Sequence, residues 1–379
     1  MSKYVYKKKF YSFLASFVDA VGYRLTRRPS KPIPPPETIL VIRMDHIGDV
    51  LSSTPIPRLL KKKYPSAKVI FLTANWASAL LEKNPHIDEI ILYDAPWFSK
   101  GRPKFPSELS WGALKKLLRS KKIDLGITLR GDVREILLMK QSRIPVRAGY
   151  GVTGGGFFLT HETTHRTGIH EIDHNLEVLK TLGIPVEGNV LPEIYLDEGE
   201  EESLEGKWAS LGLREGESYV GVLVESGLAS KNWPKTHLMS FLNQLSERHP
   251  RARVVLVGSD AKLPLTPSAD SLQLNDLRGK TSLRDLCFLI KKFSLFVGPD
   301  SGPTHLSATL GIPTVFLYSG INDLAQWGPR QSWAVVLKEG VPCSPCGLTV
   351  CNREGHPCME NITPEAVLDV IDPILSAQL

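Results

Sequence analysis

Short apolar runs alternate with helical patterns along most of this chain. In the first half the apolar runs that predict buried strands are Ile39–Ile42, Val69–Leu72, Ile90–Leu92 and Asp124–Thr128. Apolar positions at helical spacing lie between and after them, at about 51–64, 76–84, 110–120, 132–142 and 170–182. Strands that alternate with helices in this way are typical of parallel α/β folds.

The same alternation restarts after an acidic stretch, Asp197–Glu202, which introduces a helix. The strands expected in the second half are Tyr219–Val224, Val254–Val257, Leu295–Val297 and Thr314–Tyr318. Helical patterns cover 236–248, 282–291, 303–310 and a last stretch from a capping Thr363 to about Ala377. Two α/β halves predict a cleft between them, with ligands bound outside the carboxyl ends of the strands.

The pattern divides the chain into three parts. Residues 1–36 form a basic helix with a proline-rich spacer, and residues 37–195 form an N-terminal α/β domain. Residues 196–379 form a C-terminal α/β domain, with a final helix that could pack back on the N-terminal domain.

The N-terminal segment combines an apolar stripe with positive charge. Residues 1–31 carry eight basic residues against Asp19, a net charge of +7. Such a helix is suited to lie in the interface of an anionic membrane, and the alternative is plain packing on the first domain. The run from Lys31 to Pro36 is a stiff, extended spacer. The stripe residues, which share one helical face, are Phe10, Leu14, Phe17, Val18, Val21 and Leu25.

Composition narrows the class of protein. The chain has 379 residues, 42% hydrophobic and 23% charged, which suits a soluble globular enzyme rather than a disordered or collagenous protein. Five cysteines exclude a disulfide-rich scaffold, and no uninterrupted apolar run of about 18 residues predicts a membrane span. Since the net charge of +6 arises from the N-terminal segment, the body is nearly neutral and a nucleic-acid-binding face is not expected.

The first expected strand runs into a loop with two aspartates, Arg43-Met-Asp-His-Ile-Gly-Asp49. A carboxylate in a strand-to-helix loop can face a cleft and act as a base. Alternatively, Asp45 could cap the following helix and Asp49 could be a first-turn residue favoured by the helix dipole. The loop has a single glycine, so it does not predict dinucleotide binding.

Two segments of the second half suit a diphosphate. Lys231 follows a strand end, although a lone lysine could equally be a solvated surface residue. In Asp300-Ser301-Gly302-Pro303 a strand passes into a helix whose first N–H groups can bind an anion, and His305 could pack structurally or support the phosphates. Since no Asp-x-Asp pair occurs, a metal clamp on a nucleotide diphosphate is not expected.

Cysteines and glycines form two further clusters. Cys343, Cys346, Cys351 and Cys358 have a spacing that could ligate a structural metal, and a reduced loop without metal is the alternative. The glycine-rich stretch 151–156 is interpreted as a flexible loop without a phosphate role.

Taken together, these segments resemble glycosyltransferase family 9, the ADP-heptose:lipopolysaccharide heptosyltransferases. The similarity covers roughly residues 38–372, in the family's order. The matching segments are Arg43-x-Asp-x-Ile-Gly-Asp-x-Leu51 with Thr54-Pro55, Arg147-x-Gly-Tyr150, His170-Glu171, Lys231-x-Trp-Pro234, Leu277-Arg-Gly-Lys-Thr-Ser-Leu283, Val297-Gly-x-Asp-Ser-Gly-Pro-x-His305 and the cysteine loop.

The resemblance implies a GT-B fold, with two Rossmann-like domains facing a central cleft. Residues 37–195 would then bind the acceptor, and residues 196–379 would bind the nucleotide-sugar. It also implies an inverting transfer of heptose from ADP-heptose to a lipid A–core acceptor at the cytoplasmic face of the inner membrane, with no cofactor or catalytic metal. The general base falls on Asp49. Donor contacts are assigned to Lys231, Asp260, Lys280, Asp300, Ser301, Gly302 and His305. Acceptor contacts are assigned to Arg43, Asp45, Arg130, Arg134 and Arg143.

Other functions stay open at this point. Within the family, the chain could use another sugar nucleotide or an outer-core acceptor. A catalytically silent nucleotide-sugar-binding protein would tolerate loss of Asp49, which is present. A nicotinamide oxidoreductase would need a glycine-rich fingerprint, which the first loop lacks.

Overall fold

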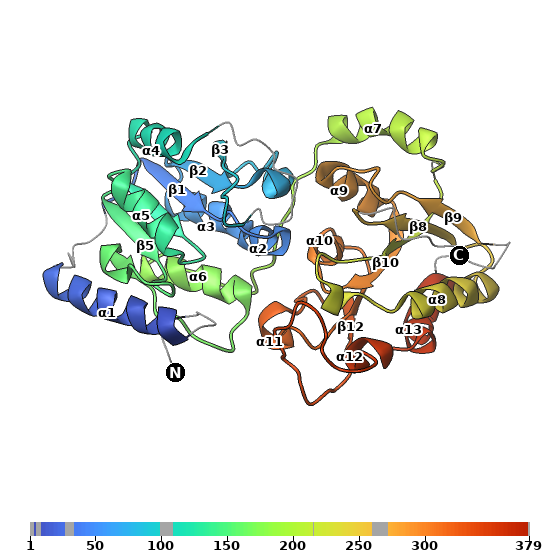
Figure 1. Ribbon diagram of the computed structural model, residues 1–379. Coiled ribbons are helices and arrows are strands. Elements are labelled where there is room, and N and C mark those ends of the chain that lie inside the picture. The colour runs from blue at the N-terminus through green and yellow to red at the C-terminus, as the bar shows by residue number, and fades with distance from the viewer. Residues whose placement is uncertain are drawn as a thin grey trace. The chain divides into compact units, whose positions relative to one another are not determined.

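The computed structural model describes residues 4, 9–26, 34–98, 109–214, 216–259 and 272–377. The chain forms two compact units, Met1–Pro192 and Glu193–Leu379 (Figure 1). Each unit contains one six-stranded sheet in which every pair of neighbouring strands is parallel. The α/β class predicted for both halves is therefore confirmed.

The first unit is built on a sheet of order β3-β2-β1-β4-β5-β6. The central strand β1 is a continuous apolar run because the side chains of Ile39–Ile42 are buried on both faces of the sheet. β5 and β6 are short strands that the apolar pattern did not predict. The strands are β1 (Thr38–Ile42), β2 (Lys68–Thr73), β3 (Glu89–Leu92), β4 (Leu125–Thr128), β5 (Val146–Gly149) and β6 (His161–Glu162).

Helices connect these strands, and two of them differ from their predictions. The pattern at 51–64 becomes two helices, α2 (Ile47–Ser53) and α3 (Pro55–Lys63), because Pro55 has no N–H to continue the first helix. The pattern at 76–84 becomes a 3-10 helix, η1 (Asn75–Leu80). The others are α4 (Trp111–Ser120), α5 (Val133–Gln141), η2 (Gly156–Phe158) and α6 (Glu171–Thr181).

The second unit repeats the winding of the first. Its sheet has the order β12-β11-β10-β7-β8-β9, so the first strand of the unit, β7, again lies beside the fourth, β10. The edge strands β9 and β12 were missed by the sequence prediction. The strands are β7 (Tyr219–Leu223), β8 (Arg253–Val257), β9 (Gln273–Asp276), β10 (Phe293–Pro299), β11 (Thr314–Leu317) and β12 (Ala334–Leu337).

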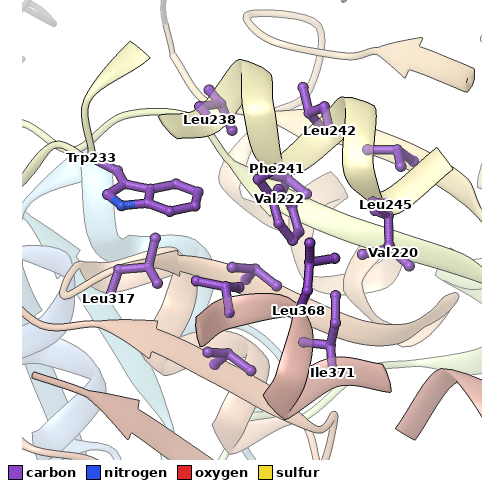
Figure 2. Close-up of a cluster of buried hydrophobic side chains, with 14 of the residues drawn as sticks. Val220, Val222, Trp233, Leu238, Phe241, Leu242, Leu245, Leu317, Leu368 and Ile371 are labelled. Carbon is purple, nitrogen blue, oxygen red and sulfur yellow. The ribbon is translucent and has the colours of Figure 1, made fainter. Parts of the chain in front are cut away.

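The core of the second unit lies between helices and the sheet. In Figure 2, side chains of α8 (Lys235–Arg248) point toward those of α13 (Pro364–Ser376), with Val220 and Val222 of β7 beside them. α13 therefore packs within this unit, and the expectation that the last helix also packs back on the first domain stays a prediction. The other helices are α7 (Glu198–Ser210), η3 (Ala229–Lys231), α9 (Leu283–Lys291), α10 (Gly302–Thr309), α11 (Leu324–Trp327) and α12 (Pro357–Glu360).

The N-terminal helix α1 (Lys9–Leu25) packs on the first unit near η2 (Figure 1). Its apolar stripe faces away from that contact: the exposed fractions of Phe10, Leu14, Phe17 and Leu25 are 69%, 47%, 62% and 80%, and Phe13 beside the stripe is also exposed. The helix thus packs on the domain while its stripe is exposed, and its contact with a membrane stays a prediction. Among the described helices, none has the length and hydropathy needed to cross a bilayer.

Candidate active site

A buried arginine organises the loop that follows β1. The side chain of Arg43 is only 2% exposed. Its guanidinium donates hydrogen bonds to Asp45 Oδ1 (2.8 Å), Asp49 Oδ1 (2.6 Å) and Glu171 Oε1 (2.9 Å). Nη1 also donates to Asn175 Oδ1 at 3.2 Å. The charge of Arg43 is thus compensated by three carboxylates, as a buried charge requires.

Asp45 is fully buried and does not cap α2. The residue at the N-cap of α2 is His46, without a side-chain cap. Asp45 instead accepts hydrogen bonds from Arg43 and, through Oδ2, from Arg130 Nη1 at 2.8 Å. The alternative that Asp45 is a helix cap is therefore wrong. This aspartate links the loop after β1 to the loop after β4.

Asp49 differs from its two carboxylate neighbours in its hydrogen bonding, because both oxygens of Asp45 and of Glu171 have partners. It lies in the first turn of α2 with its side chain 12% exposed, and in the described part of the chain only its Oδ1 has a hydrogen-bond partner. Burial and the negative charge of Asp45 raise the pKa of Asp49 to about 7, against the opposing effect of Arg43. Near neutral pH, this carboxylate can accept a proton on Oδ2.

Glu171 is held in the opposite state. Although burial opposes it, Arg43 and a hydrogen bond with His174 lower the pKa of Glu171 to about 2. Glu171 and Asn175 come from α6, which the resemblance marked only through the pair His170-Glu171, without a role. His170 is the N-cap of α6, and its ring accepts a hydrogen bond from Ile172 N–H. Glu171 is therefore a permanent counter-charge for Arg43, and the titrating carboxyl group is Asp49.

Two arginines after β4 lie on aromatic rings. The guanidinium of Arg130 is 4.3 Å from the ring centroid of Phe98, and that of Arg134 is 4.2 Å from the ring of Trp97. Arg134 is also paired with Asp132. Both side chains remain more than a third exposed, so they can bind an anion while the rings fix their orientation. No sequence pattern indicated Trp97 and Phe98 as partners of the arginines.

Arg143 does not join this group. It lies beyond the carboxyl end of α5, in the turn that leads into β5, with an exposed side chain and a φ of 63°. Arg130 and Arg134 lie at the opposite end of α5. The structure therefore removes Arg143 from the acceptor arginines on grounds of position.

Glu135 is a further buried acid that the sequence did not indicate. Its Oε2 accepts a hydrogen bond from Thr128 at 2.5 Å, and Oε1 has no partner among the described residues. Burial raises the pKa of Glu135 to about 8, which favours the protonated form of this group near neutral pH. Thr128 Oγ1 also accepts from Gly131 N–H at 3.2 Å, so the pair fixes the turn before α5.

The second unit has its own charged cluster at the ends of β7 and β10. Lys231 Nζ donates to Asp300 Oδ2 and to Asp300 O, both at 2.8 Å. His305 Nε2 lies 3.0 Å from Asp300 Oδ1, and Asn322 Nδ2 donates to Oδ2 at 2.9 Å. Although burial opposes it, His305 and Lys231 hold the pKa of Asp300 well below its usual range. Lys231 is therefore not a solvated surface lysine.

The start of α10 lies next to this cluster. Ser301 is the N-cap and makes no side-chain cap, while Gly302 and Pro303 occupy the first turn. The first N–H groups of a helix lack intrahelical partners and attract anions. His305 packs its ring 4.8 Å from that of Phe316, so it has a structural contact as well as its contact with Asp300.

Of two further predicted donor residues, Lys280 lies away from this cluster and Asp260 is not described. Lys280 Nζ donates to the backbone oxygen of Asp276 at 2.7 Å, in the turn after β9, and makes no contact with the Asp300 cluster. Asp260 lies outside the described residues.

The structure does not confirm the metal site that the spacing of the cysteine loop allowed. Cys343, Cys346, Cys351 and Cys358 are free thiols, and Cys358 is buried. Across the described residues, no three His, Cys, Asp or Glu side chains are placed to hold a metal ion. Burial and the neighbouring thiols raise the pKa of Cys358, which keeps it protonated.

Comparisons with known proteins give the family. The family model described as glycosyltransferase family 9 (heptosyltransferase) matches residues 111–356. The chain belongs to this family. It is 28% identical over 316 residues to lipopolysaccharide heptosyltransferase 3 of Escherichia coli K12, covering 77% of this chain and 86% of that protein.

Solved structures show the same fold. The ADP-heptose LPS heptosyltransferase II of E. coli matches with a TM-score of 0.71 and 22% identity, covering 90% of this chain and 99% of that one. A glycosyltransferase family 9 structure from Veillonella parvula matches with a TM-score of 0.75 and 23% identity, covering 90% and 98%. The predictions of family, GT-B fold and glycosyltransferase activity are confirmed.

Proposed function

We propose that this glycosyltransferase transfers heptose from ADP-heptose to a lipid A–core acceptor, with inversion at the anomeric carbon and Asp49 as general base. The observation that carries the proposal is the Arg43 cluster. It holds Asp49 by one oxygen, leaves the other without a hydrogen bond in the described chain, and raises its pKa to about 7. A base with these properties is suited to take the proton of a sugar hydroxyl near neutral pH.

In the proposed reaction, Asp49 Oδ2 accepts the proton from the acceptor hydroxyl as its oxygen attacks the anomeric carbon of heptose. The bond between that carbon and the diphosphate oxygen breaks, and the electron pair leaves with ADP. Arg43 does not donate or accept the proton. It keeps Oδ1 fixed and limits how far the pKa of Asp49 rises.

Charge on the leaving diphosphate is proposed to be met by the second unit. An ammonium group has three N–H donors, and Lys231 uses two of them on Asp300. The third can bind a phosphate oxygen, and the N–H groups at Ser301 and Gly302 add further donors. Asp300, held charged by Lys231 and His305, acts by positioning Lys231. We propose that this arrangement needs no divalent cation for transfer.

The acceptor is proposed to be anchored by Arg130 and Arg134. Their guanidinium groups are oriented by Phe98 and Trp97 and remain accessible, which suits the phosphates of a lipid A–core acceptor. Arg43 and Asp45 act on the acceptor side only by holding this loop, because both are buried in their mutual contacts.

The enzyme is proposed to work at the cytoplasmic face of the inner membrane. α1 exposes an apolar stripe, and basic residues flank that helix in the sequence. Such a surface is suited to an anionic bilayer. Replacing Phe13 and Phe17 with serine should release the protein from vesicles of anionic lipid. Equal vesicle binding by this variant and the unaltered protein would contradict the proposal.

The direct test supplies ADP-heptose with a panel of truncated lipid A–core acceptors, and reads the products by mass. A mass gain of one heptose with one acceptor supports the proposal and identifies that acceptor. Other sugar nucleotides are supplied in parallel. Transfer from one of those, without transfer from ADP-heptose, would contradict the proposed donor.

A further inference from the structure

Helix α1 makes buried polar contacts with the glycine-rich stretch that follows β5. The carboxylate of Asp19 is buried, and its Oδ1 accepts a hydrogen bond from Gly155 N–H at 2.7 Å. Its Oδ2 accepts a second hydrogen bond from the hydroxyl of Tyr4 at 2.9 Å. Burying a carboxylate is costly unless it is well hydrogen-bonded. A helix that served only as a membrane anchor would have no need of this group on its inner face.

A second pair of contacts clamps the same stretch. Gly22 lies against Phe157, so close that a Cβ at this position would be 2.4 Å from the ring. The Tyr23 hydroxyl donates to the carboxylate of Glu162, with distances of 2.9 and 2.8 Å to its two oxygens. That carboxylate lies against Gly156, where an added Cβ would be 2.4 Å from Glu162 Oε1. Residues 151–158 are therefore enclosed between α1 and β6.

This stretch in turn holds the turn that carries the acceptor arginines. Thr153 Oγ1 accepts a hydrogen bond from Val133 N–H at 2.8 Å and donates to Gly131 O at 3.2 Å. Gly155 packs against Val133, since an added Cβ would be 2.8 Å from Val133 Cγ2. Gly131 has a φ of 75° and directly follows Arg130, whose guanidinium reaches Asp45. A continuous series of contacts thus joins Asp19 to the turn that begins at Arg130.

We propose that α1 is a brace of the acceptor site as well as a membrane contact. Its inner face, through Asp19 and Tyr23, holds residues 151–158, and these hold Arg130 and Arg134 in the geometry that binds the acceptor. Its outer face carries the exposed apolar stripe. A protein seated on the bilayer would in this way present a formed acceptor site at the lipid surface. The inference rests on the proposed function, because it assigns Asp19 as a positioning residue for the same acceptor.

The test separates the positioning role of α1, the brace, from its membrane contact by using an acceptor that needs no membrane. With a deacylated, water-soluble core oligosaccharide, vesicle binding has no influence, so a change in KM reports the brace. Asp19→Ala leaves Gly155 N–H without its acceptor, and we expect the KM for this oligosaccharide to rise about tenfold, the cost of one unsatisfied buried group. kcat should change less, because Asp49 is not displaced.

Three further variants complete the test. Asp19→Asn keeps an oxygen that can accept from Gly155, so it should restore most of the lost affinity. Tyr23→Phe removes only the hydroxyl on Glu162 and should raise KM in the same direction by a smaller factor. Ser16→Ala, at an exposed position of the same helix, should leave KM unchanged. An unchanged KM in Asp19→Ala, with the protein folded, would overturn the inference.

A measurement that does not depend on transfer keeps the two proposals distinguishable. Amide hydrogen exchange at Val133 and Gly155 should be faster in Asp19→Ala than in the unaltered full chain, because the brace is lost. Faster exchange supports the brace even where the unaltered enzyme shows no transfer from ADP-heptose, a result that would refute only the proposed function. Unchanged exchange at Val133 would overturn the brace whatever the activity.

Discussion

Each unit has an oppositely charged pair at the ends of its first and fourth strands. The acidic residue follows the first strand in one unit and the fourth strand in the other. In each sheet the first and fourth strands of the unit are neighbours, and strand order reverses there. In the first unit, Asp45 after β1 bonds Arg130 after β4 at 2.8 Å. In the second, Lys231 after β7 bonds Asp300 at the end of β10, also at 2.8 Å. Ligand sites of doubly wound sheets occur at such switch points.

The surroundings of the two loops shift the pKa of one carboxylate in each, Asp49 and Asp300, in opposite directions. Three acids crowd around Arg43, so burial and like charge raise the pKa of Asp49. Asp300 instead meets a lysine and a histidine, and its pKa falls. One fold therefore provides a carboxylate that can take a proton and another that stays charged and holds a cation. The comparison teaches that the neighbours of each loop, rather than the winding, decide its chemistry.

The largest expected effect comes from removing the proton acceptor. Asp49→Asn keeps the shape and the contact with Arg43 but not the basic oxygen, so kcat should fall about 100-fold or more. ADP binding, assigned to the other unit, should be unchanged and serves as the control in calorimetry. Near-normal turnover in this variant would show that the proton goes elsewhere.

A smaller loss is expected when the cation of the second pair is removed. Lys231→Ala should weaken ADP binding and lower turnover by about tenfold or more, because a charge-assisted hydrogen bond to the diphosphate is lost. Transfer by the unaltered enzyme should be the same with and without a chelator. A strict requirement for Mg²⁺ would contradict the role given to Lys231.

The aromatic support of the arginines should have a more modest effect. Trp97→Leu removes the ring under Arg134 and should raise the KM for the acceptor about threefold to fivefold, the usual worth of a partly exposed cation–π contact. kcat and ADP affinity should change little. A fall in kcat without a change in KM would place Trp97 in the chemical step instead.

The smallest predicted change is in pH dependence. Because the base must be ionised, kcat should fall as pH drops through about 7, the pKa of Asp49. Asp45→Asn removes a negative charge that raises this pKa, so the acid limb should move to lower pH. A limb that moves to higher pH, or stays in place, would show that Asp45 does not act on Asp49 in this way.

The strands that the sequence missed explain where pattern analysis stops. The central strands β1, β7 and β10 were visible because burial on both faces demands apolar side chains. β9 and β12 are edge strands whose residues are mostly half-buried, and β6 is an edge strand of two residues. Such strands are held by backbone pairing, which leaves little trace in side-chain type.

The residues of the candidate site also divide into those that the sequence could indicate and those that only the folded chain brings together. Asp49, Lys231 and Asp300 could be named from the sequence because each follows a recognisable strand, and the family resemblance gave them roles. Glu171 and Asn175 reach Arg43 across 128 and 132 positions of sequence, and Gly155 lies 136 positions from Asp19. The stretch 151–156, interpreted as a flexible loop, is enclosed by such distant contacts.

What the sequence determined by itself was the alternation of elements, the loops that end the central strands, the exposed stripe of α1 and the family. These depend on local spacing and residue type. What only the tertiary structure decided was the proton affinity of Asp49, the fixed charge of Asp300, the exclusion of Arg143 and the inner contacts of α1. A pKa depends on burial and on charges within a few ångströms, and only the folded chain sets those distances.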